Sequence, residues 1–350
     1  MYEIKYTIFQ ERDIKMSFID DMKSKAKTSI KTIVLPESED IRILKAAQMI
    51  NEEGFAKVIL IGNPEKVRLD ARDNHVELGE TPIIDNFKSD KLELYANTLA
   101  DLRKNKGMTY DEALELLKTN SRYYATMMVK MGDADGYVSG ACHSTADTLR
   151  PTLQIIKGAP GTPTVSAFFV MVLPDTNFGD NGVLIYADSG LNENPNTDQL
   201  SDIAISSAKS YKELVNAEGT PKVAMLSYST KGSAHSELTD KVIEATNKVI
   251  EKDPNLIVDG ELQLDAAIIP EIAKMKAPGS PIEGRANILI FPNLDVGNIC
   301  YKMTPRLAHA EAYGPLCQGL ARPVNDLSRG CSAEDIVGVV AITCVQAQNM

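Results

Sequence analysis

The sequence predicts an α/β protein built from two doubly wound domains that share a cleft. Short apolar runs rich in β-branched residues alternate with amphipathic helical stretches along most of the chain. The connections between these elements are short, and the sequence contains no repeat or low-complexity linker. A chain of 350 residues also exceeds the ~250–300 residues at which single hydrophobic cores stop growing. Two domains with a ligand site between them therefore account for the pattern.

The first predicted unit is a strand, a helix and a parallel return strand. Residues 31–37, KTIVLPE, form a β-branched run, and residues 56–65, AKVILIGNPE, form a second one. Residues 39–54 between them have helical periodicity and end at Gly54. Their apolar positions share one stripe: Ile43, Leu44, Ala47 and Ile50. Such a crossover is expected to be right-handed.

The same alternation continues to the C-terminus. Helices are expected in residues 101–119, 197–215 and 237–252 and from Ser332 onward. Strands that lead into loops are expected in residues 132–151, 221–236 and 286–298. Two apolar strands, residues 164–173 and 182–190, suit an antiparallel hairpin. We assign residues 16–158 plus 318–350 to the first domain, residues 159–317 to the second, and residues 1–15 to an N-terminal extension.

The composition narrows the class of partner. The chain carries 37 Lys and Arg against 48 Asp and Glu, a net charge of −11, which disfavours nucleic acid and anionic membranes. No apolar run approaches the ~18 residues of a membrane span, and the first residues lack the core of a signal peptide. The five cysteines are odd in number and form no CxxC pair, and the four histidines form no HExxH motif. We therefore expect free thiols in a reducing cytoplasm, with neither disulfides nor a zinc site.

Four loops at expected strand ends concentrate serine, threonine, glycine and cationic residues. In open α/β sheets ligands bind beyond the carboxyl ends of strands, and helix N-termini suit phosphate groups. An anionic ligand of so acidic a protein must meet a local cluster of cations. The candidate ligand-binding residues of these loops are Ser144, Thr145, Arg150, Ser229, Lys231, Lys276, Ser328 and Arg329.

Each of these loops also has a purely structural interpretation. Ser144-x-x-Asp147 and Ser332-x-x-Asp335 are capping-box patterns that begin helices without any chemistry. Lys276 can equally be a surface lysine that is solvated and binds no ligand. Cys331 is either a small buried hydrophobe or an acyl-carrying nucleophile, and we favour the hydrophobe. The absence of GxGxxG and GxxxxGK[ST] weakens nicotinamide and P-loop nucleotide interpretations.

Long blocks of the sequence resemble the phosphate acetyltransferase family, also called phosphotransacetylases. The resemblance extends from about Lys31 to the C-terminus and leaves out the first fifteen residues. Its colinear blocks are KTIVLPESEDIRILKAA, LRKNKGMT, VSGACHSTADTLRPTLQIIK, PKVAMLSYSTKGSA, DGELQLDAAIIPEIAKMKAPGSPIEGRANILIFP and GPLCQGLARPVNDLSRGCSAEDIV.

The resemblance implies a reversible acetyl transfer between acetyl phosphate and coenzyme A, with phosphate as the other product. It implies direct attack by the coenzyme A thiol in a ternary complex, with no metal and no cofactor beyond coenzyme A as a substrate. It also implies two domains of the isocitrate/isopropylmalate dehydrogenase-like fold, an active site in the cleft between them, a cytoplasmic location and a homodimer.

Carried over residue by residue, the resemblance assigns the catalytic base to Asp335 and the transition-state arginine to Arg329, with Ser328 beside it. Arg150 and Arg103 match ligand-binding arginines of the family. A free thiol has a pKa of ~8.5 and a free aspartate ~3.9, so an aspartate alone is a weak base for a thiol. Desolvation, neighbouring cations or proton transfer concerted with attack would narrow that gap.

Two departures and two rival functions belong beside this resemblance. The stretch GNICYKMTPRLAHAEAYGP carries Cys300, Pro305 and His309-Ala310 where the family more usually has Gly, a polar residue and Gly, and FGDNGVLIYADSGLNENP is longer than usual. We expect the first to alter helix packing near the dimer or the cleft, and neither to touch Asp335 or Arg329. A butyryl-transferring branch typically lacks the full PVNDLSRGC block, so acetyl is preferred, with propionyl as a side substrate.

Two rival functions remain: a metal- and NAD-dependent hydroxyacid dehydrogenase of the same fold, and a regulatory module that binds acetyl-CoA without catalysis.

Overall fold

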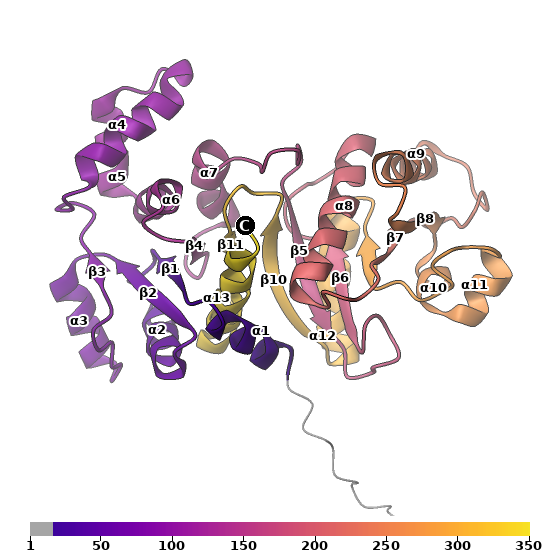
Figure 1. Ribbon diagram of the computed structural model, residues 1–350, viewed down its shortest axis with the longest axis horizontal. Helices are drawn as coiled ribbons and strands as arrows, with labels where there is room; N and C mark the ends of the chain where they lie inside the picture. The colour runs from indigo at the N-terminus through magenta and orange to yellow at the C-terminus, as the bar shows by residue number, and fades with distance from the viewer. Residues whose placement is uncertain (1–16) are drawn as a thin grey trace, which may run out of the picture.

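The computed structural model describes residues 17–350, so the expected extension at residues 1–15 lies outside the described residues. Two β-sheets lie side by side, each with helices packed against it, and the chain passes from the first to the second and back (Figure 1). The predicted α/β class with two sheet-centred units is confirmed. No helix in the described part of the chain is long and apolar enough to cross a membrane.

The first sheet is parallel throughout. Its strands, from edge to edge, are β11 (Val324–Asp326), β4 (Gly136–Ser139), β1 (Lys31–Leu35), β2 (Ala56–Ile61) and β3 (Ile83–Ile84). Its helices are α1 (Phe18–Lys27), α2 (Ile41–Glu53), α3 (Pro64–Asp73), α4 (Leu92–Arg103), α5 (Tyr110–Thr119), α6 (Ser121–Met131) and α7 (Thr145–Ile155), with a 3₁₀ turn at Lys104–Lys106.

The predicted β1–α2–β2 unit is confirmed. All four residues of the expected apolar stripe of α2 are buried, which is why the helix lies against the sheet: Ile43, Leu44, Ala47 and Ile50. Gly54 ends α2 with a φ of +66°, a left-handed conformation that glycine adopts at no steric cost. Hydrophobic periodicity therefore fixes both the length and the buried face of this helix.

The second sheet is mixed. Its strands, in order, are β10 (Glu311–Gln318), β5 (Ser166–Val172), β6 (Val183–Ala187), β9 (Ile288–Ile290), β7 (Lys222–Leu226) and β8 (Ile257–Leu262). β5 and β6 form the predicted antiparallel hairpin, and β10 pairs antiparallel with β5. The remaining pairs are parallel. Its helices are α8 (Thr197–Leu214), α9 (Glu237–Lys252), α10 (Leu264–Ile268), α11 (Pro270–Lys276) and α12 (Leu294–Ala308).

The last helix, α13 (Ala333–Gln348), joins the two halves of the molecule. It lies between the sheets (yellow in Figure 1) and packs against α1, α2 and β4 on one side and α8 and β10 on the other. Almost every residue of α13 is buried, as expected of a helix that is apolar all round. The turn that precedes α13 is therefore held at the junction of the two halves.

Candidate active site

A pocket of about 480 Å³ opens where the turn after β11 meets α12 and β10. The turn and the start of α13 line one side of it with Leu327, Ser328, Gly330, Cys331 and Asp335. The second half of the molecule lines the other side with Tyr301, Lys302, Arg306, Tyr313 and Gly314. The pocket is thus an interdomain site that collects residues far apart in sequence, as the cleft hypothesis requires.

Asp335 lies in the first turn of α13 and lines the pocket at the same time. The predicted capping box is confirmed, because the Ser332 N–H donates to Asp335 Oδ2 at 2.8 Å and the Asp335 N–H donates to Ser332 Oγ at 3.1 Å. The side chain of Asp335 is nevertheless exposed, and it lines the pocket wall. Within residues 17–350 its Oδ1 accepts no hydrogen bond, so one carboxylate oxygen remains available to a ligand. Helix capping and chemistry are therefore compatible at this position.

Ser328 and Arg329 occupy the exposed turn before this helix. Ser328 lines the pocket, and its hydroxyl accepts only a long hydrogen bond of 3.4 Å from the Gly330 N–H. The guanidinium of Arg329 is exposed, makes no ion pair with any described residue and is not part of the pocket wall. The structure thus brings Ser328 and Asp335 together, with Arg329 at the rim of the same turn.

Arg42, at the start of α2, holds this turn in place. Its Nη1 donates to the carbonyl oxygens of Arg329 and Cys331, both at 2.8 Å, and its Nη2 donates to that of Ala141 at 2.6 Å. Asp40 pairs with the same guanidinium at 2.6 Å and raises the pKa of Arg42. One partly exposed cation therefore ties together the loops after β1, β4 and β11. Sequence reasoning did not single out Arg42, although its place just after a strand end was a signal.

Two buried carboxylates lie beneath these loops, at the carboxyl edge of the first sheet. Asp326 is 1% exposed, and its Oδ2 accepts the hydroxyl of Thr145 at 2.6 Å. Its Oδ1 is buried and has no hydrogen-bond partner among residues 17–350. Burial raises the pKa of Asp326 to about 6. The Thr145–Asp326 bond joins the start of α7 to the end of β11, so the two predicted site regions are neighbours.

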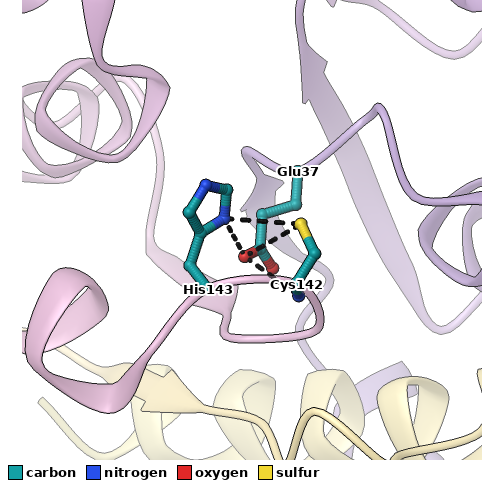
Figure 2. A group of neighbouring side chains, drawn as sticks. All are labelled: Glu37, Cys142 and His143. Atoms are coloured by element: carbon teal, nitrogen blue, oxygen red, sulfur yellow. Dashed lines mark hydrogen bonds and ion pairs between the residues drawn. The ribbon is translucent and has the colours of Figure 1, made fainter.

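The second carboxylate, Glu37, belongs to a compact cluster with Cys142 and His143. Figure 2 shows the three side chains converging, with Glu37 Oε1 2.7 Å from His143 Nδ1 and 3.5 Å from Cys142 Sγ. Burial would raise the pKa of Glu37, but His143 and two backbone N–H groups outweigh it and hold that pKa below its ordinary value. Burial and the carboxylates of Glu37 and Glu39 raise the pKa of the Cys142 thiol.

Three arginines gather around the first turns of α7. Burial raises the pKa of the Tyr123 hydroxyl, and the nearby charges of Arg150 and Arg103 oppose that rise. Arg122 and Arg150 both help to lower the pKa of Asp147, whose main cause is a hydrogen bond from Ser144. The Nε atoms of Arg103 and Arg122 are buried without a hydrogen-bond partner in the described part of the chain. Arg122 is a residue that the sequence reasoning missed.

The capping of α7 differs in one detail from the predicted box. Ser144 caps the helix, because its Oγ accepts the Asp147 N–H at 3.2 Å. The Asp147 carboxylate accepts the Ser144 hydroxyl at 2.7 Å rather than the backbone N–H of Ser144. The prediction of a full capping box is therefore wrong here: the Asp147 carboxylate accepts the Ser144 hydroxyl in place of the Ser144 backbone N–H.

None of the seven residues predicted to bind the substrates lines the pocket. Ser144, Thr145, Arg150 and Arg103 lie around α7, and the other three have partners elsewhere. Ser229 is fully buried and donates to Glu261 Oε1 at 2.8 Å. Lys231 pairs with Asp259, and Lys276 pairs with Asp265 at 2.7 Å. The cations that do line the pocket are Lys302 and Arg306 of α12, which the sequence reasoning passed over because no motif marks them.

Cys331 lines the pocket but is largely buried. Burial is the main cause that raises the pKa of its thiol, to about 11, and the nearby charge of Arg42 opposes the rise. A thiol of that pKa is almost entirely protonated near neutral pH and is a poor nucleophile. The chemistry of this side chain matches the small hydrophobe expected from the sequence.

Comparison with known proteins supplies the context of this pocket. The model of the phosphate acetyl/butaryl transferase family matches residues 17–344. The chain is 62% identical over 333 residues to a phosphate acetyltransferase from Acetivibrio thermocellus, covering 95% of this chain and 99% of that relative.

Solved structures agree with the family match. A phosphotransacetylase from Streptococcus pyogenes is 40% identical and superposes with a TM-score of 0.89, covering 95% of this chain and 98% of the other. A 4-hydroxythreonine-4-phosphate dehydrogenase from Klebsiella pneumoniae is 12% identical with a TM-score of 0.53, over 91% of this chain and all of the other, and shares the fold alone.

Proposed function

Because the chain belongs to the phosphate acetyl/butaryl transferase family, we propose that its reaction takes place in the pocket between α12 and the start of α13. The chain is an acyltransferase that moves an acetyl group reversibly between acetyl phosphate and coenzyme A. The observation that supports the location is the meeting of Asp335 and Ser328 with the cations Lys302 and Arg306 around one cavity. These residues supply a base, a hydroxyl and an anion-binding wall.

The proposed step is direct attack in a ternary complex. The sulfur of coenzyme A forms a bond to the acetyl carbon, the bond from that carbon to the phosphate oxygen breaks, and Asp335 accepts the thiol proton. Arg329, with its planar fork, is the group that stabilises negative charge on the carbonyl and on the departing phosphate. Ser328 donates its hydroxyl to the same phosphate. The exposed guanidinium of Arg329 and the open Oδ1 of Asp335 support these roles.

We assign the phosphates of coenzyme A to the region around α7. Arg103 and Arg150, with Arg122 beside them, concentrate positive charge there in a protein of net charge −11. Ser144 and Thr145 add the N-terminal turn of α7, whose dipole favours anions. Because the Thr145 hydroxyl already donates to Asp326, its contribution to a ligand is the backbone N–H. Ser229, Lys231 and Lys276 stay predictions, to be tested by alanine variants and the Michaelis constant for coenzyme A.

In this proposal the acetyl transfer uses no metal and no cofactor. An assay that follows thioester absorbance with acetyl phosphate and coenzyme A, with and without a chelator, tests this requirement directly. We expect full activity after chelation and none of the ping-pong kinetics or isolable acetyl-enzyme that a covalent route would give. If acetyl-enzyme accumulates without coenzyme A, direct transfer is wrong. If instead divalent metal and NAD raise the melting temperature together and thioester fails to form, the dehydrogenase rival is favoured.

A homodimer is the proposed assembly. Helix α12 exposes an apolar stripe at helical spacing, with Val296 39%, Ile299 62%, Met303 47% and Leu307 74% exposed. A stripe of this kind on a surface helix is typical of a face that packs against another copy. Light scattering of the wild type should give twice the chain mass, and Ile299→Glu combined with Leu307→Glu should give the monomer mass. An unchanged mass in the double variant would rule out this face.

The remaining proposals concern partners, location and domain boundaries. The net charge of −11 supports the absence of nucleic-acid binding, and five cysteines outside any disulfide support a reducing cytoplasm. The division into residues 16–158 plus 318–350 and residues 159–317 is supported by the return of β11 to the first sheet after β10. Limited proteolysis near residues 158 and 318 tests that division.

A further inference from the structure

No CxxC or HExxH spacing predicted a zinc site, but the fold brings Glu37, Cys142 and His143 together in a cluster that has the composition of one and takes no part in the proposed reaction. Its three donor atoms are a carboxylate oxygen, a thiol sulfur and an imidazole nitrogen, all within 4.8 Å of one another. Cys142 Sγ lies 3.4 Å from His143 Nδ1 and 3.5 Å from Glu37 Oε1. A fourth donor, Glu39 Oε1, lies 3.7 Å from the same sulfur.

These separations are close to those of a tetrahedral zinc site. Zinc binds sulfur at ~2.3 Å and nitrogen or oxygen at ~2.0–2.2 Å, so neighbouring ligand atoms stand ~3.3–3.6 Å apart. The two contacts of the sulfur with Nδ1 and Oε1 already have this spacing. The contact of 2.7 Å between Glu37 Oε1 and His143 Nδ1 is a hydrogen bond that a metal would replace. A small opening of that one contact brings the three donor atoms to tetrahedral spacing, whereas Glu39, which contacts the sulfur alone, has to move closer to His143 and Glu37 to become a fourth ligand.

The protein holds the carboxylate in position for such a role. Glu37 is fully buried, and its Oε2 accepts the N–H groups of Gly140 at 2.7 Å and Ala141 at 2.9 Å. Oε1 is thereby aimed at the sulfur and the imidazole. Hydrogen bonds of this kind to the second oxygen orient the ligands of natural metal sites.

The local charge also favours a cation. Glu37, Glu39 and Asp40 all act on the sulfur of Cys142. Arg42, a cation that interacts with the Cys142 sulfur, is neutralised by its ion pair with Asp40 at 2.6 Å. A bound divalent ion would therefore meet an excess of negative charge.

We propose that Cys142, His143 and Glu37 bind a zinc-class divalent cation, with Glu39 within reach as a fourth ligand. On binding, the Cys142 thiol releases its proton to solvent, and neutral His143 turns the lone pair of Nδ1 to the metal. The ion cross-links the loop after β1 to the loop before α7. It stabilises the folded chain and stands apart from the acetyl-transfer chemistry.

Cobalt substitution tests the ligand set directly. Co²⁺ added to the purified chain should produce a thiolate-to-metal charge-transfer absorption, and Zn²⁺ should abolish it at one equivalent. Cys142→Ser should lose the absorption, whereas Cys300→Ser, which changes the other accessible thiol, should keep it. If the absorption survives in Cys142→Ser or vanishes in Cys300→Ser, the assignment is wrong. This readout does not depend on transferase activity, so it stands or fails separately from the proposed function.

Melting curves provide the second measurement. Zn²⁺ should raise the melting temperature of the wild type and of Cys300→Ser, and should not raise that of Cys142→Ser. Glu39→Gln should keep the cobalt absorption but weaken zinc binding ~10-fold, since one of four ligands is lost. Equal zinc affinity in Glu39→Gln would remove Glu39 from the ligand set. Equal stabilisation of all variants by zinc would overturn the proposal.

Discussion

The turn after β7 and the turn after β11 both follow a buried strand, and both set a cation among serines and glycines. In the turn after β7, Glu261 accepts the Ser229 hydroxyl and the Gly232 N–H, each at 2.8 Å, and Lys231 pairs with Asp259. In the turn after β11, Ser328 and Arg329 are exposed, and the structure gives the Arg329 guanidinium no carboxylate among residues 17–350.

The difference lies in the neighbouring strand rather than in the turn itself. β8 brings two acidic side chains, Asp259 and Glu261, next to the turn after β7, and they saturate its donors. The turn after β11 is held through its backbone instead, because Arg42 donates hydrogen bonds to the carbonyl oxygens of Arg329 and Cys331. The side chains of Ser328 and Arg329 form no ion pair with a described residue. A polar turn whose side chains are saturated serves the fold, and one whose side chains stay open can serve a ligand.

The largest expected effect comes from the open turn. Arg329→Ala and Asp335→Ala should each lower kcat by ~10²–10³, with a smaller change in the Michaelis constants, because both side chains are proposed to act mainly in the transition state. Lys231→Ala, the matched change in the saturated turn, should keep kcat near that of the wild type, and any effect of this variant should fall on the Michaelis constant for coenzyme A. Steady-state kinetics of the three variants decides the comparison. Near-normal kcat in either of the first two would remove its assigned role.

The next effect concerns the pH dependence of stability at Asp326, beneath the open turn. Its pKa in the folded protein is about 6, above the ordinary value of 3.8. The protonated acid therefore contributes stability that is present below pH ~4 and is lost as the pH rises towards 6, ~3 kcal/mol in all.

Asp326→Asn removes this titration. The unfolding free energy of the variant relative to the wild type should rise by up to ~3 kcal/mol between pH 4 and pH 7. Urea unfolding across that range measures the difference. A difference that stays constant with pH would mean that Asp326 does not titrate with a raised pKa.

The saturated turn should respond in stability and not in catalysis. Glu261→Ala leaves the Ser229 hydroxyl and the Gly232 N–H without their acceptor, at a cost of ~2 kcal/mol of unfolding free energy. The kcat of the folded variant should stay within about twofold of the wild type, because Glu261 does not line the pocket. Urea unfolding and an activity assay at low temperature separate the two quantities. A large loss of kcat with normal stability would make this turn part of the active site.

The smallest expected effect is at Cys331, inside the open turn. Because its thiol has a pKa of about 11 and is largely buried, Cys331→Ala should keep near-normal activity and lose only a little packing energy. Activity assays with a thiol-blocking reagent on the wild type provide the control. Abolished turnover in a folded Cys331→Ala would instead favour an acyl-cysteine intermediate.

Local patterns in the sequence were enough to predict several of the elements, but not the short strands β3 and β11 or the helices α3, α6 and α12. The β1–α2–β2 unit, the β5–β6 hairpin and the capping box of α13 depend on periodicity, hairpin length and hydrogen bonds between residues three apart. The placement of Ser328 and Asp335 together needed only the turn that joins them. The family resemblance depended on the same continuous blocks.

Tertiary structure alone decided which polar residues are saturated. Glu261 reaches Ser229 across 32 positions, Arg42 reaches Arg329 across 287, and Glu37 reaches His143 across 106. No local pattern encodes such contacts, because they depend on strand order and on which loops share the carboxyl edge of a sheet. The sequence by itself therefore determined several elements and the family to which the chain belongs, because these depend on local periodicity and continuous blocks, whereas long-range packing decided which of the candidate residues remain open to a ligand.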